Sequence, residues 1–528
     1  MAAPFQGRQR AKGSASVFAE MCYYLRVRTF GAPHHAMKTL FLLKETMVYE
    51  RMGLMYLIGA LKKRGKAVDL LITGALTRDE ILRKVDAIAP EIVAVSAMTG
   101  EHNYYLSLLD TLKRHRTFFS LIGGPHPTFS PEVVLNECLD AGCIGEGEEA
   151  MLDLVSAVEQ GKPVDAIPNL CVRRDGEYRC TPPRPLVENL DEIPFPDREL
   201  IYSRDRLLER DRIKTFFTIR GCPYQCAYCF NKAFNEMYRG KGGGVRTRSV
   251  DNFIAEVNEV RHRYPTELLS IYDDNFLLHS VEWLEEFADK LPRQVGLPFI
   301  VNFIPNLVTD EKIRLLKKAG VSYIEMALET ADDDVNREIL KRVPTRKEIT
   351  EAARILHAHK IKFQVDCLIG LPVKDPLENA FRTMDFEITL RPTFALANIL
   401  YPYPKTPIHD YVVAHGYYRP QDAGSREKFF TRNYSVLDFG DPKVTMQIAK
   451  LHKLWGITVS HPFILRRLTR LLIRLPLLKL YTYMFWAWHG LSYRFRLATT
   501  SSSYRDLPQY IKRIFSYLPG IEKDAEEC

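Results

Sequence analysis

The sequence predicts an α/β protein with two successive parallel sheets and a helical C-terminal region, and three observations indicate this fold class. From residue 37 to residue 161, short apolar runs alternate with amphipathic helical patterns, which is typical of a doubly wound parallel sheet. The alternation resumes at residue 215 and supplies six further strand–helix units, which fit a partial (β/α)6 barrel. Residues 443–503 differ in composition, and a helical region is expected over residues 416–528.

The composition is that of an ordinary globular protein with room for several domains. Hydrophobic residues make up 46% of the 528 residues and charged residues 26%, which permits a sizeable core. The length favours two to three domains. The expected divisions are a tail (1–36), a first α/β domain (37–165), a hairpin with a proline-rich linker (166–212), a partial barrel (213–415) and a basic and aromatic helical region (416–528).

The tail contains Arg8, Arg10 and Lys12 but no sustained apolar run, so it is not expected to be a secretory signal. The first domain that follows should hold a five-stranded parallel sheet. Its strand candidates are residues 39–43, 67–72, 92–96, 118–122 and 143–145. Ligands of such sheets bind outside the carboxyl ends of the strands.

Small residues stand at those strand ends in the first domain. Ser96 ends the third strand candidate, Gly123 and Gly124 follow the fourth, and His126 comes two residues later. Paired glycines let a backbone approach a bulky ligand closely. His126 is either part of such a ligand site or a loop histidine with local hydrogen bonds.

The segment 166–212 should connect the two α/β domains. Its first part predicts a hairpin around Asp175 and Gly176. Five prolines between residues 182 and 196 then favour an extended linker.

The partial barrel should place its site at the carboxyl ends of its strands. The strand candidates are residues 215–219, 268–272, 299–303, 323–328, 363–369 and 394–400. Polar residues follow two of them: Asp273, Asp274 and Asn275 follow the second, and Glu329 follows the fourth. These side chains are therefore candidates for ligand binding, although Asp273 and Asp274 could also cap a loop.

Three cysteines follow the first barrel strand. Cys222, Cys226 and Cys229 have the spacing C-x3-C-x2-C in one tight loop after Gly221. Three thiolates can hold three irons of a [4Fe–4S] cluster and leave the fourth iron open for a ligand. The alternative, a structural zinc site, needs four protein ligands, and no second cysteine or histidine pair follows downstream.

This motif resembles that of the radical S-adenosylmethionine (SAM) superfamily. The resemblance implies that SAM binds the open iron and that its reductive cleavage gives a 5′-deoxyadenosyl radical. It also implies that Tyr228 lies near the adenine, that Asp273, Asp274 and Asn275 lie near the SAM amino group, and that Glu329 lies near the ribose. An electron donor of the flavodoxin or ferredoxin type is expected as a partner.

The first domain resembles the Rossmann-like cobalamin-binding domain that precedes the radical SAM domain in one large subfamily. Ser96, Gly123 and Gly124 match the serine and double-glycine elements of that domain, and His126 is a further candidate. The loop 44–49 after the first strand has no histidine, which departs from the D-x-H-x-x-G motif of cobalamin proteins that use a lower axial histidine. The resemblance therefore implies cobalamin binding without histidine ligation to cobalt.

The function implied by both resemblances is cobalamin-dependent radical SAM catalysis. Most of that subfamily resembles methylases, so the expected reaction is methyl transfer to an unactivated carbon or phosphorus of a hydrophobic or small-molecule substrate. One alternative is a radical cyclase or rearrangement enzyme of the anaerobic Mg-protoporphyrin ester cyclase type. Another is an iron–sulfur protein that binds or senses without turnover.

The remaining cysteines and the C-terminal charges bear on location. Ten cysteines are too few for a disulfide scaffold, and an oxidation-sensitive cluster favours a reducing cytosol. The seven cysteines outside the motif are expected to be buried or incidental thiols: Cys22, Cys138, Cys143, Cys171, Cys180, Cys367 and Cys528.

Residues 461–500 predict peripheral contact with a membrane. They hold seven basic residues, no acidic residue and an aromatic cluster between Tyr481 and Trp488, and such a mixture is typical of an interfacial segment. A basic amphipathic helix packed on the barrel and a nucleic-acid surface are the alternatives, and nucleic acid is not the expected partner.

Overall fold

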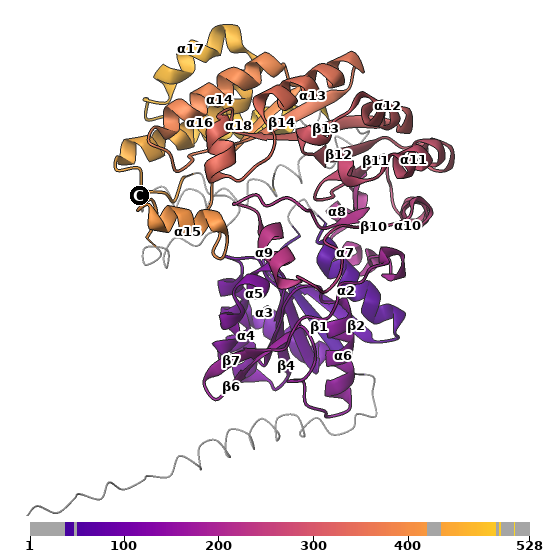
Figure 1. Ribbon diagram of the computed structural model, residues 1–528. Coiled ribbons are helices and arrows are strands. Elements are labelled where there is room, and N and C mark those ends of the chain that lie inside the picture. The colour runs from indigo at the N-terminus through magenta and orange to yellow at the C-terminus, as the bar shows by residue number, and fades with distance from the viewer. Residues whose placement is uncertain (1–36, 47–49, 420–433, 493–495, 498–511, 513–528) are drawn as a thin grey trace, which may run out of the picture. The chain divides into compact units, whose positions relative to one another are not determined.

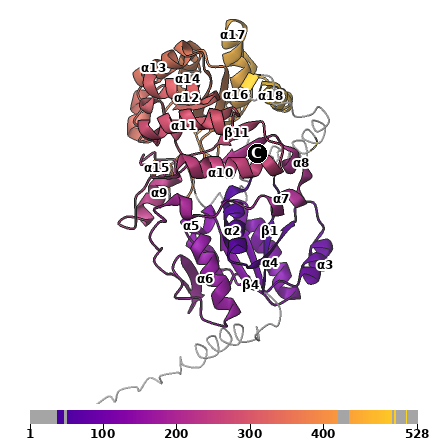
Figure 2. The same ribbon diagram turned by 90° about the vertical axis from the view of Figure 1, so that its right-hand side faces the viewer.

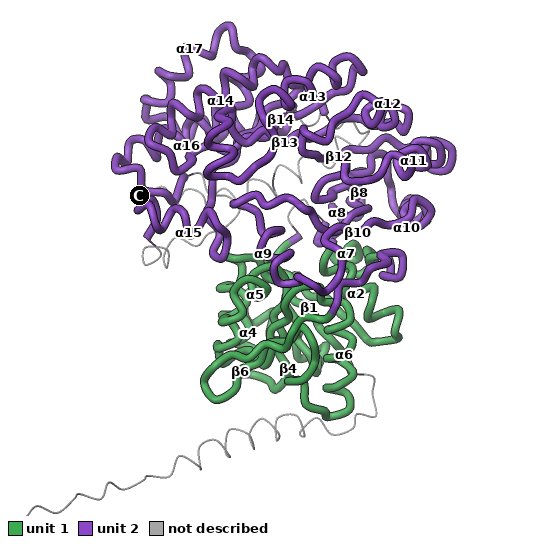
Figure 3. Tube along the Cα trace, viewed as in Figure 1, with its two compact units in different colours: residues 1–45, 53–184, 196–204 green, residues 46–52, 185–195, 205–528 purple. Residues whose placement is uncertain are grey.

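The computed structural model describes residues 37–46, 50–419, 434–492, 496–497 and 512. The tail 1–36, part of the loop 44–49, Cys22, Cys528 and parts of the C-terminal region lie outside the described residues. The chain divides into two compact units (Figure 3). Among the described residues, the first unit comprises 37–45, 53–184 and 196–204, and the second comprises the rest.

The first unit is a seven-stranded sheet with helices on both faces (Figure 1), in the order β2-β1-β3-β4-β5-β6-β7. Its strands are β1 (Lys38–Leu43), β2 (Ala67–Ile72), β3 (Ile92–Ser96), β4 (Phe119–Gly123), β5 (Ala141–Cys143), β6 (Leu170–Arg174) and β7 (Glu177–Cys180). Its main helices are α2 (Met52–Lys63), α3 (Arg78–Ile88), α4 (His102–His115) and α6 (Glu148–Glu159). The strands β1 to β5 are parallel, and β1, β3 and β4 are almost wholly apolar because both faces are buried. The predicted doubly wound sheet is therefore confirmed.

The predicted hairpin is present, but it extends the first sheet instead of belonging to the linker. The strands β6 and β7 pair antiparallel, and β6 also pairs with β5. Asp175 and Gly176 both have positive φ values, 54° and 82°, which suit the tight turn of a two-residue hairpin. The fifth strand lies two residues earlier than predicted, at Ala141–Cys143.

The prediction that Cys171 and Cys180 are incidental thiols is wrong, because they form a disulfide across this hairpin. They are direct partners in the β6–β7 register, with their Cα atoms 3.9 Å apart. The three other described cysteines outside the motif, Cys138, Cys143 and Cys367, are buried free thiols as predicted.

The second unit contains the predicted parallel sheet, with its strands in chain order. They are β8 (Ile213–Phe216), β11 (Leu268–Ile271), β12 (Phe299–Phe303), β13 (Val321–Glu329), β14 (Lys362–Ile369) and β15 (Phe394–Ile399). Five helices lie along one side of this sheet (Figure 2): α10 (Val250–Arg263), α11 (Val281–Gln294), α12 (Asp310–Ala319), α13 (Arg346–Ala358) and α14 (Pro376–Leu390). The first predicted barrel strand is split: β8 ends at Phe216, and β9 (Ile219–Arg220) pairs instead with β10 (Arg246–Thr247).

Local sequence explains where these helices begin. Ser249, Ser280, Thr309 and Thr345 precede α10 to α13, and each side-chain oxygen accepts a hydrogen bond from the backbone three residues on. Serine and threonine are favoured at this position because they satisfy amide groups that the helix cannot.

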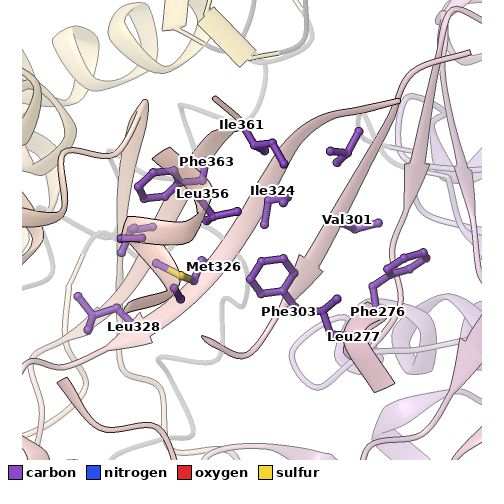
Figure 4. Close-up of a cluster of buried hydrophobic side chains, with 14 of the residues drawn as sticks. Phe276, Leu277, Val301, Phe303, Ile324, Met326, Leu328, Leu356, Ile361 and Phe363 are labelled. Atoms are coloured by element: carbon purple, nitrogen blue, oxygen red, sulfur yellow. The ribbon is translucent and has the colours of Figure 1, made fainter. Parts of the chain in front are cut away.

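The core of the second unit lies between the strands and these helices. Ile324, Met326 and Leu328 of β13 face the helices and pack with Val301 and with residues of neighbouring strands (Figure 4). The alternate residues of β13 therefore face the inside of the barrel.

The outer edge of β15 is covered by α16 (Pro442–Ser460). Gly456 permits this close approach, because a Cβ there would lie 2.9 Å from the carbonyl oxygen of Ala395. The buried Trp455 on the same helix donates a 2.6 Å hydrogen bond to Glu387 of α14. The chain continues through α17 (Pro462–Leu472) and α18 (Leu478–Ser492), as the predicted helical region. No helix in the described ranges is long and apolar enough to cross a membrane.

Candidate active site

The cysteine loop lies between β9 and α9 (Phe230–Met237) and is fixed by backbone contacts. Gly221, which precedes Cys222, has a φ of 94°, and a Cβ there would lie 1.8 Å from the carbonyl oxygen of Gly244. Only glycine fits this position. Within the loop, the amide of Ala227 donates to Leu340 and its carbonyl accepts from Ile408.

The three motif cysteines are free thiols in an apolar setting. Cys222 and Cys226 are buried, and Cys229 is half-buried. Burial raises the pKa of Cys222 to about 12 and that of Cys229 to about 11, and in each case the neighbouring thiols add to the increase. Bare thiolates would be costly here, so the loop suits a positively charged metal centre that stabilises them.

The arrangement favours a cluster over a single zinc ion. In the part of the chain that the structure describes, no group of three or more cysteine, histidine or acidic side chains is placed to hold one metal ion. In an iron–sulfur cluster each thiolate binds a different iron, so the sulfurs need not converge on one point. Three thiolates are one ligand short of a closed structural zinc site, whereas they match three irons of a [4Fe–4S] cluster, so the residues of this loop fit the cluster better.

The polar residues that follow β11, the second strand of the barrel, hold this loop in place. The buried Asp273 accepts hydrogen bonds from the amides of Thr218 and Ile219, at 2.6 and 2.9 Å, and from the Thr218 hydroxyl. Burial raises its pKa to about 7. Asp273 thus ties the end of β11 to the turn that enters the cysteine loop.

Asp274 and Asn275 have similar local partners. Asp274 accepts from the amide of Gly221 at 3.0 Å and from the Asn231 side chain at 3.1 Å. Asn275 accepts from the amide of Leu277 and caps a short helical turn. Asp273 and Asp274 therefore border the cysteine loop, and Asn275 follows them in the chain. A direct role of the three residues toward SAM stays a prediction.

Tyr228 and Glu329 come together with an arginine that the sequence did not single out. The Tyr228 hydroxyl donates to Glu329 Oε1 at 2.8 Å, and Arg342 Nη1 donates to the same oxygen at 2.9 Å. Arg342 also donates to the Tyr228 oxygen, at 2.7 Å, and to the carbonyl of Ala327. Burial raises the pKa of Glu329, and Arg342 opposes this rise.

The inner face of the barrel carries two further carboxylates that sequence reasoning missed. Glu325 of β13 accepts from Tyr323 at 3.2 Å, and Asp366 of β14 accepts from Gln364 at 2.7 Å. Burial raises the pKa of both, and Glu325 raises that of Asp366 further. No basic group acts on either carboxylate within the described ranges. The sequence did contain a signal for both residues, because each is a charged residue within an otherwise mostly apolar predicted strand.

In the first unit, Ser96 and Gly123 are register partners at the carboxyl ends of β3 and β4. Gly124 has a φ of 92°, and a Cβ there would lie 2.8 Å from Ser96 Oγ. The second glycine is thus required by packing within the domain. Because β1 lies between β2 and β3, Ser96 stands at the topological switch point, where ligands of such sheets bind. The role of these residues toward a cofactor stays a prediction.

His126 makes local contacts. Its ring stacks on that of His102, with 3.6 Å between the centroids, and its Nδ1 lies 3.2 Å from Thr99 Oγ1. Burial lowers its pKa to about 3, so the imidazole is neutral. These contacts favour the interpretation as a loop histidine. The described part of the loop after β1, Lys44 to Thr46, also offers no imidazole.

Comparisons with known proteins identify both α/β domains. Residues 216–383 match the radical SAM superfamily, and residues 41–155 match the B12 binding domain. The chain is a cobalamin-dependent radical SAM enzyme. Its cofactors are accordingly SAM, a [4Fe–4S] cluster and cobalamin.

Similar proteins support this assignment over most of the enzyme's length. An uncharacterized methyltransferase of Pyrococcus horikoshii is 25% identical over 437 residues, which are 80% of this chain and 93% of that protein. The anaerobic magnesium-protoporphyrin IX monomethyl ester cyclase of Rubrivivax gelatinosus is 26% identical over 334 residues, 60% of this chain and 58% of that protein.

Solved structures show the same fold. The cobalamin-dependent radical enzyme OxsB superposes with a TM-score of 0.66 at 14% identity and covers 94% of this enzyme and 80% of its own chain. The radical SAM methyltransferase TsrM of Kitasatospora setae, with cobalamin and a [4Fe–4S] cluster bound, superposes with a TM-score of 0.60 at 18% identity and covers 74% of this enzyme and 79% of its own chain.

Proposed function

We propose that this enzyme transfers a methyl group to an unactivated carbon or phosphorus of a hydrophobic or small-molecule substrate. Together the cofactors supply reductive SAM cleavage to a 5′-deoxyadenosyl radical and a methyl group carried on cobalamin. The observation that carries the proposal is the set of three free thiols in one anchored loop at the carboxyl edge of the barrel. An electron donor of the flavodoxin or ferredoxin type would serve as partner.

Cys222, Cys226 and Cys229 would hold three irons, and the residues around them would keep that geometry. Asp274 fixes the start of the loop through Gly221. The side chain of Asn235 donates a 2.8 Å hydrogen bond to the carbonyl of Cys222. A buried apolar cluster that includes Ala227, Leu340, Leu371, Leu400 and Ile408 would exclude water from the loop.

Glu329 would bind the sugar of SAM. Its Oε1 is occupied by Tyr228 and Arg342, which fix the carboxylate in one orientation. Its Oε2 accepts no hydrogen bond from the described residues and so could accept one from a hydroxyl. Tyr228 would border the adenine, as the resemblance implies.

Ser96, Gly123 and Gly124 would receive cobalamin at the edge of the first sheet. The Ser96 hydroxyl can donate to or accept from the cofactor's polar groups, and the half-buried Gly123 and Gly124 place backbone beside it without a side chain. His126 would shape this edge through His102 and Thr99.

The test is anaerobic turnover by the reconstituted full-length enzyme under reduction. We expect 5′-deoxyadenosine from the wild type and S-adenosylhomocysteine alongside it with a methyl acceptor. Cys226→Ala should abolish SAM cleavage because two thiolates cannot hold the cluster. Cys138→Ala removes a buried free thiol elsewhere and should retain cleavage. Wild-type cleavage by Cys226→Ala would overturn the assignment.

Radical cyclisation without methyl transfer is the second candidate. The similarity to three magnesium-protoporphyrin ester cyclases supports it. Turnover would then consume a porphyrin ester and release 5′-deoxyadenosine, but it would not form S-adenosylhomocysteine. The remaining alternative, a protein that only senses, has no support, because the similar proteins are named as enzymes.

A further inference from the structure

The last two described helices expose an unusual amount of apolar surface. Of the fifteen large apolar side chains that are exposed in the described ranges, ten lie between residues 463 and 491. They are Phe463, Ile464, Leu468, Leu471, Leu475, Leu477, Leu480, Tyr483, Met484 and Leu491. Isolated exposed leucines need no explanation, but a concentration of this kind marks an interaction surface.

On α17 these residues form a stripe opposite the buried face. Ile464, Leu468 and Leu471, followed by Leu475, recur every three or four residues, which places them on one side of a helix. Thr469, by contrast, is buried and bonds Thr458 of α16 at 2.8 Å. The helix therefore has one side against the protein and an apolar side that faces outward.

The helix α18 repeats this arrangement. Leu480, Met484 and Leu491 recur with the same periodicity and are exposed. The other face packs inward through Tyr481, which donates to the carbonyl of Leu472 at 3.0 Å. Most aromatic residues of the predicted interfacial cluster are therefore wholly or half buried, and aliphatic side chains dominate the exposed face.

The charges of this region are sorted between the two sides. Arg466 and Arg470 turn toward α14, where they pair with Asp385 and Glu378. Arg467, Arg474 and Lys479 are exposed and form no ion pair with described residues. No acidic residue occurs from residue 442 to residue 505. The outward face is thus apolar, with positive charge that no acidic residue in the described ranges neutralises.

We propose that α17 and α18 dock this enzyme on an anionic lipid bilayer, with both helices lying in the plane of the headgroups. The aliphatic stripes would enter the boundary between the headgroups and the acyl chains, and the side chains of Arg467, Arg474 and Lys479 would contact lipid phosphates. The proposal concerns the folded protein and does not depend on its cofactors or its reaction.

Two other occupants fit the surface less well. In a symmetric dimer through this face, Arg467, Arg474 and Lys479 would meet their own copies without any acidic partner. A nucleic acid would use the cations but would leave the aliphatic stripes in water. A bilayer with anionic headgroups accommodates both features at once.

The test is co-sedimentation of the full-length protein with phosphatidylcholine vesicles, with and without phosphatidylserine. We expect pelleting with the anionic vesicles, weaker pelleting at high salt, and little with neutral ones. The triple variant R467Q/R474Q/K479Q should bind about a hundredfold more weakly, because each cation near an anionic surface contributes roughly fivefold. The matched control R466Q/R470Q also removes arginines of α17, but these face α14, so binding should persist.

The apolar stripe is tested separately with L468Q/L471Q, which should also lose binding. Val413→Gln is the control, because Val413 is a comparably exposed apolar residue on α15 (Pro407–Ala414). Circular dichroism checks that each variant is folded. The proposal is overturned if the wild type stays in the supernatant at low salt. It is also overturned if L468Q/L471Q pellets with anionic vesicles as fully as the control R466Q/R470Q does. If the wild type dimerises but does not bind vesicles, and L468Q/L471Q abolishes the dimer, the surface serves self-association and the proposal is overturned.

Discussion

Tyr228, between the second and third cysteines, donates a hydrogen bond of 2.8 Å to Glu329 at the end of β13. Arg342 donates to both partners, so the buried Glu329 and Arg342 and the half-buried Tyr228 hold one another. Glu329 has a φ of 64°, which is uncommon for a residue other than glycine. Such a conformation persists where its surroundings fix it, and it occurs often at ligand sites. The cysteine loop and the barrel strand are therefore one connected site.

Removing the Tyr228 hydroxyl should weaken SAM cleavage without loss of the cluster. Tyr228→Phe leaves all three thiols in place, so the reconstituted iron content should equal that of the wild type. Cleavage should fall about tenfold, since a hydrogen bond to a charged group contributes about 1.5 kcal/mol. Tyr224→Phe, which removes a hydroxyl of the same loop bonded to Asn306, is the control. Loss of iron from Tyr228→Phe would show instead that the residue is structural.

Removing Arg342 should destabilise the protein more than removing the whole ion pair. Arg342→Met leaves the buried Glu329 carboxylate without its cation, at a cost of about 3–5 kcal/mol. The double variant Glu329→Gln/Arg342→Met removes both charges and should recover part of that loss. Urea unfolding of the apoprotein measures both. Equal destabilisation of the two variants would mean that the unpaired Glu329 carboxylate costs nothing, which contradicts the prediction.

Periodicity in the sequence predicted both parallel sheets, because strands buried on two faces are apolar runs of recognisable length. The cysteine loop was predictable for a related reason, since its ligands lie close together in the chain. The role of Arg342 could not be predicted, because this residue lies thirteen positions after Glu329 in the chain and no local sequence pattern marks it.

Long-range pairing also explains the errors. The β6–β7 hairpin joined the first sheet because β5 offered a free edge, which linker composition does not reveal. Cys171 and Cys180 are register partners in that hairpin. Their disulfide therefore depends on how the strands pair, which the number of cysteines in the sequence does not reveal. The exposed stripes of α17 and α18 likewise needed the structure, because the sequence does not say which apolar face is covered.

The stability of the barrel should depend on pH through Asp366. An aspartate has a pKa of about 4 in the unfolded chain, and burial beside Glu325 raises it in the folded chain. Between the two values the folded state binds more protons, so the free energy of unfolding falls as pH rises. Asp366→Asn removes this penalty and should stabilise the apoprotein more at pH 8 than at pH 5.5, by about 1 kcal/mol or more. The exposed Asp110→Asn is the control, and an identical gain at both pH values would contradict the prediction.

Cobalamin should bind without a histidine ligand to cobalt. The ring of His126 is held by His102 and Thr99, and the loop 44–49 after β1 contains no histidine. The EPR spectrum of the Co(II) form should therefore lack axial nitrogen splitting, and His126→Gln should leave that spectrum unchanged. Nitrogen splitting that disappears in His126→Gln would show that the loop rearranges to place His126 on the metal.

A methyl group on Gly124 should affect both the first domain and its cofactor. In Gly124→Ala the new Cβ would fall 2.8 Å from Ser96 Oγ and 3.0 Å from the backbone of Ala97, at a φ that alanine rarely adopts. The turn after β4 must then move away from β3, at a cost of about 1–3 kcal/mol. Because Ser96 and this turn are proposed to receive cobalamin, we expect a lower melting temperature and a large loss of corrin absorbance after anaerobic reconstitution. The matched control is Gly53→Ala, since a Cβ at Gly53 meets nothing within 4 Å and its φ is not positive. The control should keep its cofactor and be at least as stable, because alanine favours helix α2. A Gly124→Ala protein that melts at a lower temperature and still binds cobalamin fully would show that the β3–β4 edge is not the cofactor site.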